Sequence, residues 1–135
     1  MLLVEFGAEV TKATRDNGVT PLLMAAQAGH VEVVRILVME GRAGVNKATT
    51  DNGSTPLYMA AQNGHVEVVR ILVLDGGADV NKARTGNRIT PLYVAAHGGH
   101  VEVVRILVMY GGADVNKATT EEGTTPLFMA AQNGH

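Results

Sequence analysis

The ten residues GHVEVVRILV occur three times without change, at positions 29–38, 64–73 and 99–108. A Thr-Pro-Leu triplet precedes each copy and occurs once more near the end of the chain. The four prolines of these triplets, Pro21, Pro56, Pro91 and Pro126, follow one another at intervals of 35 residues. A fixed period of this length is typical of repeat proteins, so the repeating unit determines the fold.

The period accounts for nearly all of the 135 residues, which leaves no separate domain or linker. We therefore predict a single repeat domain over 1–135. Its boundaries are a partial unit 1–13, full units 14–48, 49–83 and 84–118, and a partial unit 119–135.

The first half of each unit predicts a short helix. Thr20 can cap a helix whose first residue is Pro21, where a missing N–H costs nothing. The segment 22–28 then runs without a helix breaker up to Gly29, which predicts a left-handed C-terminal glycine.

The following VEVVRILV is rich in β-branched residues and could by propensity alone be a strand. Its charges favour a helix. Glu32 and Arg35 are three residues apart, which would place them on opposite faces of a strand but on one face of a helix. The apolar residues left for burial on the second helix are Val33, Val34, Ile36, Leu37 and Val38.

The remainder of each unit predicts a projecting hairpin with little sheet pairing. Gly76, Gly77 and the polar stretch 81–90 lead to the next Thr-Pro, and Asn17-Gly18 and Asn52-Gly53 are tight-turn signals. The predicted fold class is an all-α repeat solenoid of stacked helix-turn-helix units with projecting hairpin loops.

Composition excludes several classes of function. The net charge of −2 and the few aromatic residues argue against a nucleic-acid partner. No stretch approaches the about 20 apolar residues of a membrane span. The absence of cysteine excludes disulfides and thiolate chemistry and fits a reducing compartment, so we expect an intracellular, cytoplasmic protein. We also expect neither a cofactor nor a small-molecule ligand.

Motifs for catalysis and metal binding are missing in any linked form. There is no Gly-x-Ser-x-Gly and no His-Glu-x-x-His, and the sole serine is Ser54 in a predicted hairpin tip. His97 and His100 have helix-like spacing, but the two glycines between them predict a helix end, and no third ligand is near. We predict neither an enzyme nor a metal site.

The segment DNGSTPLYMAAQNGHVEVVRILVLDGGADVN, residues 51–81, resembles an ankyrin repeat, whose signature is Thr-Pro-Leu-His-x-Ala in about 33 residues. The resemblance covers essentially the whole chain. It departs from the family at the histidine of the signature, so we expect apolar stacking where the family has a polar tie between units. The replacing residues are Leu23, Tyr58, Tyr93 and Phe128. The period is also two residues longer, with one extra residue near Gly76-Gly77 and one in the hairpin.

Two further repeated positions have a structural interpretation. The histidines of the Gly-His pairs predict a turn and capping role. At a second repeated position we expect the side chains to lie in the core between units. The residues at this position are Met24, Met59, Val94 and Met129.

The resemblance implies that hairpin tips and first-helix ends line a concave groove that binds other proteins. The positions that differ between units at these places are the candidate partner-binding residues. They are Arg15, Asp16, Asn17, Val19, Asp51, Asn52, Ser54, Gln62, Asn63, Arg84, Asn87, Arg88, Ile89, His97, Glu121, Glu122 and Thr124.

The third unit stands apart from the others. It alone carries Arg84, Arg88, Ile89 and His97, a basic patch with an apolar neighbour beside the acidic pair 121–122 of the next unit. This pattern fits an interface anchor or drift in one unit equally well.

The predicted function is a protein-protein interaction module that binds a protein partner without catalysis. The alternative is a structural spacer or a fragment of a longer array. That alternative includes end-to-end self-association, because the chain starts within a second helix and stops after the first helix of a unit, and neither end matches a polar capping unit.

Overall fold

A computed structural model of the chain describes residues 18–40 and 44–113. These residues contain helices and turns and no strand, so the helical interpretation of VEVVRILV is confirmed. One helix pair lies in each of the three predicted full units. The elements are α2 (Pro21–Ala28), α3 (Val31–Met39), α4 (Pro56–Gln62), α5 (Val66–Arg70), η1 (Ile71–Asp75), α6 (Pro91–His97) and α7 (Val101–Met109), of which η1 is a π-helical segment that continues α5.

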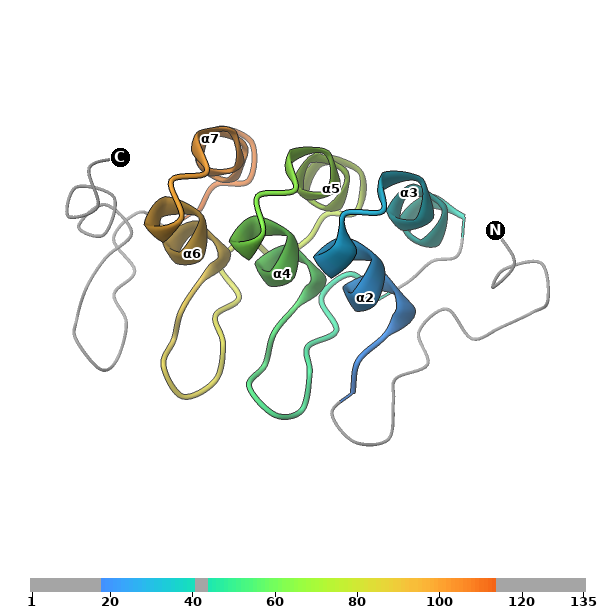
Figure 1. The fold of residues 1–135 in the computed structure, drawn as a ribbon, viewed down its shortest axis with the longest axis horizontal. Coiled ribbons are helices and arrows are strands. Elements are labelled where there is room, and N and C mark those ends of the chain that lie inside the picture. Colours follow the sequence, from blue (N-terminus) through green and yellow to red (C-terminus); the bar gives the residue numbers. More distant parts are fainter. Residues whose placement is uncertain (1–17, 41–43, 114–135) are drawn as a thin grey trace.

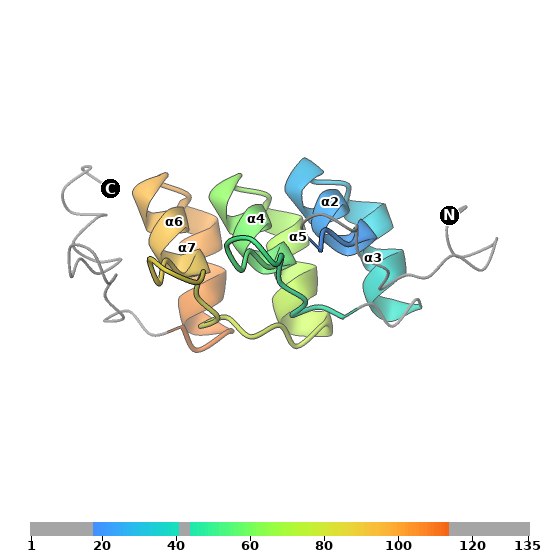
Figure 2. The same ribbon diagram turned by 90° about the horizontal axis from the view of Figure 1, so that it is seen from below.

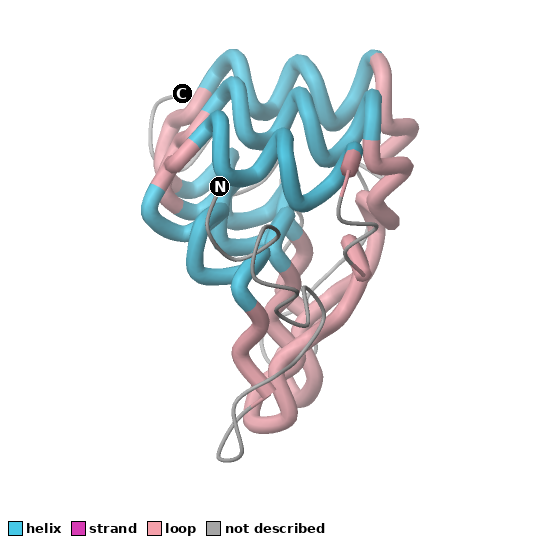
Figure 3. The backbone as a smooth tube through the Cα atoms, turned by 90° about the vertical axis from the view of Figure 1, so that its right-hand side faces the viewer, coloured by secondary structure: helices cyan, strands magenta, loops and turns pink. Residues whose placement is uncertain are grey.

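The helix pairs stack side by side in two layers (Figure 1). The first helices form one layer, in which α4 packs between α2 and α6, and the second helices form the other, in which α5 packs between α3 and α7. From below, the hairpins that precede α4 and α6 lie next to each other in the same order as the helices (Figure 2). Viewed along the stack, the two helical layers occupy one end and the loops project from the other (Figure 3).

Each first helix begins at its threonine in the predicted way. The Oγ1 atoms of Thr20, Thr55 and Thr90 accept hydrogen bonds from the backbone N–H three residues later, at 3.2, 3.1 and 3.1 Å. All three threonines are buried, so each cap is shielded from water. At the other end, Gly29 takes the left-handed conformation with φ 77°, and the N–H of His30 reaches the carbonyl of Ala25 at 3.0 Å.

The second helices carry the predicted ion pairs on their solvent face. The Arg–Glu distances are 3.5, 3.3 and 3.6 Å in the pairs of α3, α5 and α7. Both partners of each pair are substantially exposed, so each pair contributes a few tenths of a kcal/mol in magnitude. Burial of the opposite, apolar face therefore dominates the energetics of these helices.

The extra residue near Gly76-Gly77 produces a wide turn at the end of the second helix. The N–H of Gly76 bonds the carbonyl of Ile71 at 2.9 Å, five residues back, and the N–H of Ala78 bonds that of Leu72 at 2.9 Å. A Cβ atom on Gly76 would lie 2.9 Å from the Leu72 carbonyl oxygen, and Gly77 has φ 62°. Glycine is needed at both positions, at the first for close approach and at the second for its backbone conformation.

The Gly-His histidines link neighbouring units, which corrects the capping role predicted for them. His65 and His100 occupy the N-cap positions of α5 and α7, but their side chains do not cap these helices. Their Nε2 atoms lie 2.9 and 3.1 Å from the carbonyl oxygens of Gln27 and Gln62 in the preceding unit. The carbonyl groups at a helix C-terminus have no partner within the helix, so each histidine satisfies one of them from the next unit.

We expect the packing of His100 against Gly64 to be measurable as stability. A Cβ atom on Gly64 would lie 2.7 Å from the His100 ring, whereas one on Gly77 would meet nothing within 4 Å. Both glycines have positive φ, so Gly64→Ala and Gly77→Ala share a backbone cost of about 1 kcal/mol, and Gly64→Ala adds about 1–3 kcal/mol of overpacking.

Urea unfolding of the two variants measures this difference. In a His100→Ala background the excess cost of Gly64→Ala should disappear. Equal losses for Gly64→Ala and Gly77→Ala in the parent chain would contradict the close packing.

Candidate functional site

The tip of the second hairpin is closed by its own polar side chains. The N–H of Thr49 bonds the carbonyl of Ser54 at 2.9 Å, and Asn52 Oδ1 accepts from Thr49 Oγ1 at 2.9 Å and from Ser54 Oγ at 2.7 Å. Ser54 is buried and Asn52 is half-buried, whereas Asp51 is exposed. Of the predicted binding residues in this tip, Asp51 is therefore the one presented to solvent, and the other two hold the loop in shape.

The Asp51 carboxyl group has a pKa below its ordinary value of 3.8. The largest cause is the Thr49 side chain, followed by the backbone N–H of Asn52, which donates to Asp51 Oδ1 at 2.7 Å. The positive charge of Arg84 in the next unit acts in the same direction. The tip thus carries a fixed negative charge at neutral pH.

The tip of the third hairpin is closed in a similar way but has a different residue at one of its positions. The N–H of Arg84 bonds the carbonyl of Ile89 at 2.9 Å, and Asn87 Oδ1 accepts from the N–H of Ile89 at 3.1 Å. Arg88 is exposed and has φ 59°, the one positive φ of a non-glycine residue among the described residues. The equivalent positions of the preceding hairpins are Gly18 and Gly53, with φ 73° and 72°.

Arg84 is half-buried, and its side chain is bonded to the preceding unit. Its Nη1 donates to the hydroxyl oxygen of Tyr58 at 3.1 Å, and its Cζ lies 5.1 Å from the centre of that ring. Tyr58 is buried and sits in the unit before Arg84. The apolar stacking expected where the family has a histidine is therefore wrong at Tyr58, because a tyrosine retains a polar atom that can bond across the unit boundary.

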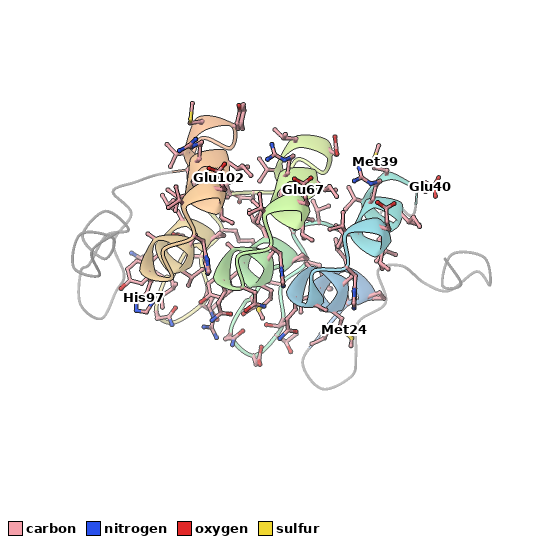
Figure 4. The ribbon with its side chains drawn as sticks, turned by 45° about the horizontal axis from the view of Figure 1, so that its top comes forward. Met24, Met39, Glu40, Glu67, His97 and Glu102 are labelled. Carbon is pink, nitrogen blue, oxygen red and sulfur yellow. The ribbon has the colours of Figure 1, made fainter. Side chains whose placement is uncertain are left out.

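The exposed face of the first helices adds residues to the tips. Gln27, Gln62 and His97 share one position of the repeat and are exposed. Asn63 is also exposed, and its Nδ2 donates to the Gln27 carbonyl at 3.0 Å. Met24 and His97 lie on the side of the helices that faces the hairpins (Figure 4).

The prediction that the methionine position forms inter-unit core is wrong at Met24, which is 59% exposed. Met59 and Val94 at the same position are half-buried. Met24 precedes Gln27 by three residues, so both lie on the same side of α2. The exposure of Met24 could have been predicted from the sequence, because Met24 lies three residues before the polar residue Gln27 on the same helix.

The remaining predicted binding residues divide into two groups. Val19, Asn87 and Ile89 are half-buried in the hairpins. Six others lie outside the described residues, as do both partial units and thus the ends expected to self-associate. These six are Arg15, Asp16, Asn17, Glu121, Glu122 and Thr124.

Within residues 18–40 and 44–113, no group of three or more His, Cys, Asp or Glu residues is placed to hold a metal ion. The Nε2 atom of His100 is engaged with the Gln62 carbonyl. None of the helices in this part of the chain has the length and apolar character needed to cross a membrane.

Comparison with protein families assigns the fold class. The family model for ankyrin repeats in three copies matches residues 1–84 and again 74–135, which together span the chain. The chain belongs to the ankyrin repeat family, whose members are generally protein-protein interaction modules. No curated protein matches the sequence.

The lowered pKa of Asp51 gives a test of the tip geometry. Thr49→Val removes the largest cause of the shift, so the Asp51 pKa should rise toward its ordinary value. Because the folded-state pKa lies below the unfolded one, the stabilisation by this carboxylate is present above the unfolded pKa and is lost as the pH falls through the folded value.

Carboxyl chemical shifts followed by NMR over an acid titration measure this pKa. Thr50→Val is the control, because Thr50 is exposed and does not contribute to the shift. A rise of similar size in both variants would contradict the assignment of Thr49 as the largest cause of the shift.

Proposed function

We propose that the chain binds a protein partner through the face formed by its hairpin tips and the exposed side of its first helices, and that it performs no catalysis. We place this interaction in the cytoplasm, since a chain without cysteine needs no oxidising compartment. The partner-binding residues of this proposal are those that the structure leaves exposed among the predicted set. They are Asp51, Gln62, Asn63, Arg88 and His97.

The observation that carries the proposal is the backbone of Arg88. A non-glycine residue with φ near +60° costs about 1–2 kcal/mol relative to an ordinary conformation. Glycine at the equivalent positions of the other hairpins avoids this cost. Residues held in strained conformations cluster at functional sites, and an exposed arginine at the end of a loop is suited to anchor an interface.

The surroundings of Arg88 support a partner of mixed chemistry. Ile89 is half-buried beside it, and Asp51 of the neighbouring tip is exposed and negatively charged. The first-helix layer adds the amides of Gln62 and Asn63 and the exposed thioether of Met24. A methionine surface adapts to irregular apolar contacts, so this face combines charge selection with an adaptable apolar contact.

The alternative function is a spacer within a longer array, including self-association through its ends. A spacer would not need the hairpin tips, and its stability would be improved by glycine at residue 88. Both functions therefore predict that glycine at residue 88 stabilises the fold, but the binding function alone predicts that the substitution weakens a partner complex.

We expect Arg88→Gly to stabilise the fold and weaken partner binding. The substitution relieves the strained φ, so the free energy of unfolding should rise by about 1 kcal/mol. Arg88→Ala removes the same side chain without relieving the backbone. Both variants should weaken partner binding by about 1–2 kcal/mol, mainly through faster dissociation.

The measurement uses the partner captured from cell extract on the intact chain, with its kinetics followed by surface plasmon resonance. Arg70→Ala is the control, because Arg70 pairs with Glu67 at 3.3 Å on the opposite layer. Equal weakening by Arg70→Ala would show that only general charge matters. Binding that is unchanged in all three variants would favour the spacer.

A further inference from the structure

A row of apolar side chains crosses the ends of the second helices. Met39, Leu74 and Met109 occupy the same position of three consecutive units and are 58%, 50% and 69% exposed. Tyr110, which is 61% exposed, extends the row at the third unit. Figure 4 shows Met39 at the end of α3, in the second-helix layer, away from Met24 and His97 of the first layer. We call these four residues the outer row.

The outer row is not required for packing of the stack. In α3, Met39 follows Glu32 by seven residues, two turns along the same solvent face. The buried residues of α3, Val34 and Leu37, lie on the opposite side. Exposed apolar residues therefore recur at one repeat position in three consecutive units, and exposed apolar surface gathered on one side of a soluble protein marks an interaction site.

Unpaired acidic groups border the outer row on one side. Glu40 and Asp75 directly follow Met39 and Leu74, are exposed, and form no ion pair that the described residues show. On the other side, the arginines of the solvent face are already paired with glutamates. Within the part of the chain that the structure describes, the charge beside the row that no ion pair compensates is therefore negative in the first two units, and Tyr110 replaces the acidic residue in the third.

The spacing of the row matches an α-helix lying across the second helices. Side-by-side helices are about 8–10 Å apart, so successive members of the row are separated by a similar distance. Seven residues of an α-helix advance about 10.5 Å and return to the same face. A strand covers this distance in about three residues, which would place successive apolar side chains on opposite faces.

We propose that the outer row binds an amphipathic helix of a protein partner, with apolar residues seven positions apart and Lys or Arg on one flank. The apolar residues of this helix lie over Met39, Leu74 and Met109, and its basic flank lies over Glu40 and Asp75. This surface is separate from the hairpin face, so the chain has two docking surfaces on opposite layers.

The negative border distinguishes this occupant from two others. A second copy of the chain placed row against row would bring acidic borders together, which is unfavourable. An anionic membrane surface would be repelled by the same carboxylates. A basic helix is attracted by them.

The test uses a synthetic helical peptide of about 18 residues, long enough to span three contacts seven residues apart. It carries leucine at those contacts and lysine on one flank, and its twin carries glutamate in place of lysine. Binding to the full chain is measured by fluorescence anisotropy. We expect saturable binding of the lysine peptide and much weaker binding of the twin.

Two sets of variants test the surface. Leu74→Gln at the centre of the row should lower the affinity for the lysine peptide about tenfold, whereas Val101→Gln should change this affinity less than about twofold. Val101 is a matched control, since it is apolar and 59% exposed but begins α7 at the other end of the helix. Glu40→Lys with Asp75→Lys should reverse the preference between the two peptides, and Arg88→Gly should leave both unchanged.

Three outcomes would overturn the proposal. The first is no saturable binding of the lysine peptide, and the second is an equal effect of Leu74→Gln and Val101→Gln. The third is self-association in sedimentation, or binding to phosphatidylcholine–phosphatidylserine vesicles, that Leu74→Gln abolishes.

Discussion

Each unit of this protein packs its two helices against each other but completes the burial of its apolar surface against its neighbours. The central unit shows this most clearly, because Val69, Ile71 and Val73 of its second helix are all buried between α3 and α7. The equivalent of Ile71 in the first unit is half-buried, and the equivalent of Val73 in the third unit, Val108, is exposed. Stability is therefore a property of adjacent pairs, and polar links such as His65 to the Gln27 carbonyl fix the register in which those pairs meet.

The sequence was sufficient to predict the helix ends and the ion pairs within a unit. Thr-Pro at a helix start, glycine at its end and an i,i+3 ion pair are local patterns, and the structure shows all three as expected. Contacts between units were harder to predict, because the partner lies more than 25 residues away. The carbonyl bonded by His65 and the arginine bonded by Tyr58 belong to neighbouring units, at separations of 38 and 26 residues. Nothing in a local pattern distinguishes a histidine that caps its own helix from one that reaches the previous unit.

Variation between units was a weaker guide to the binding face than it first appears. Arg84 differs from its counterparts, but its side chain is committed to Tyr58 inside the stack. Arg88 also differs, and its difference has an energetic cost that packing does not explain. The alignment of the 35-residue units contained this second signal, since Arg88 stands where the three other units have Gly18, Gly53 and Gly123. Replacement of a glycine that the other units share is therefore a better guide to the binding face than a change in charge alone.

The same repetition that builds the core also places equivalent surface residues in straight rows. Met39, Leu74 and Met109 line up because any position repeated every 35 residues must do so in a stack of equivalent units. Such rows arise in both layers, at Gln27, Gln62 and His97 on one and at the outer row on the other. Because the layers are joined by the buried core and by the bonds between units, the residues of each row have a fixed spacing in the unbound protein. A partner that orders itself along a row therefore bears the entropic cost of binding alone, and the stack loses little freedom in receiving it.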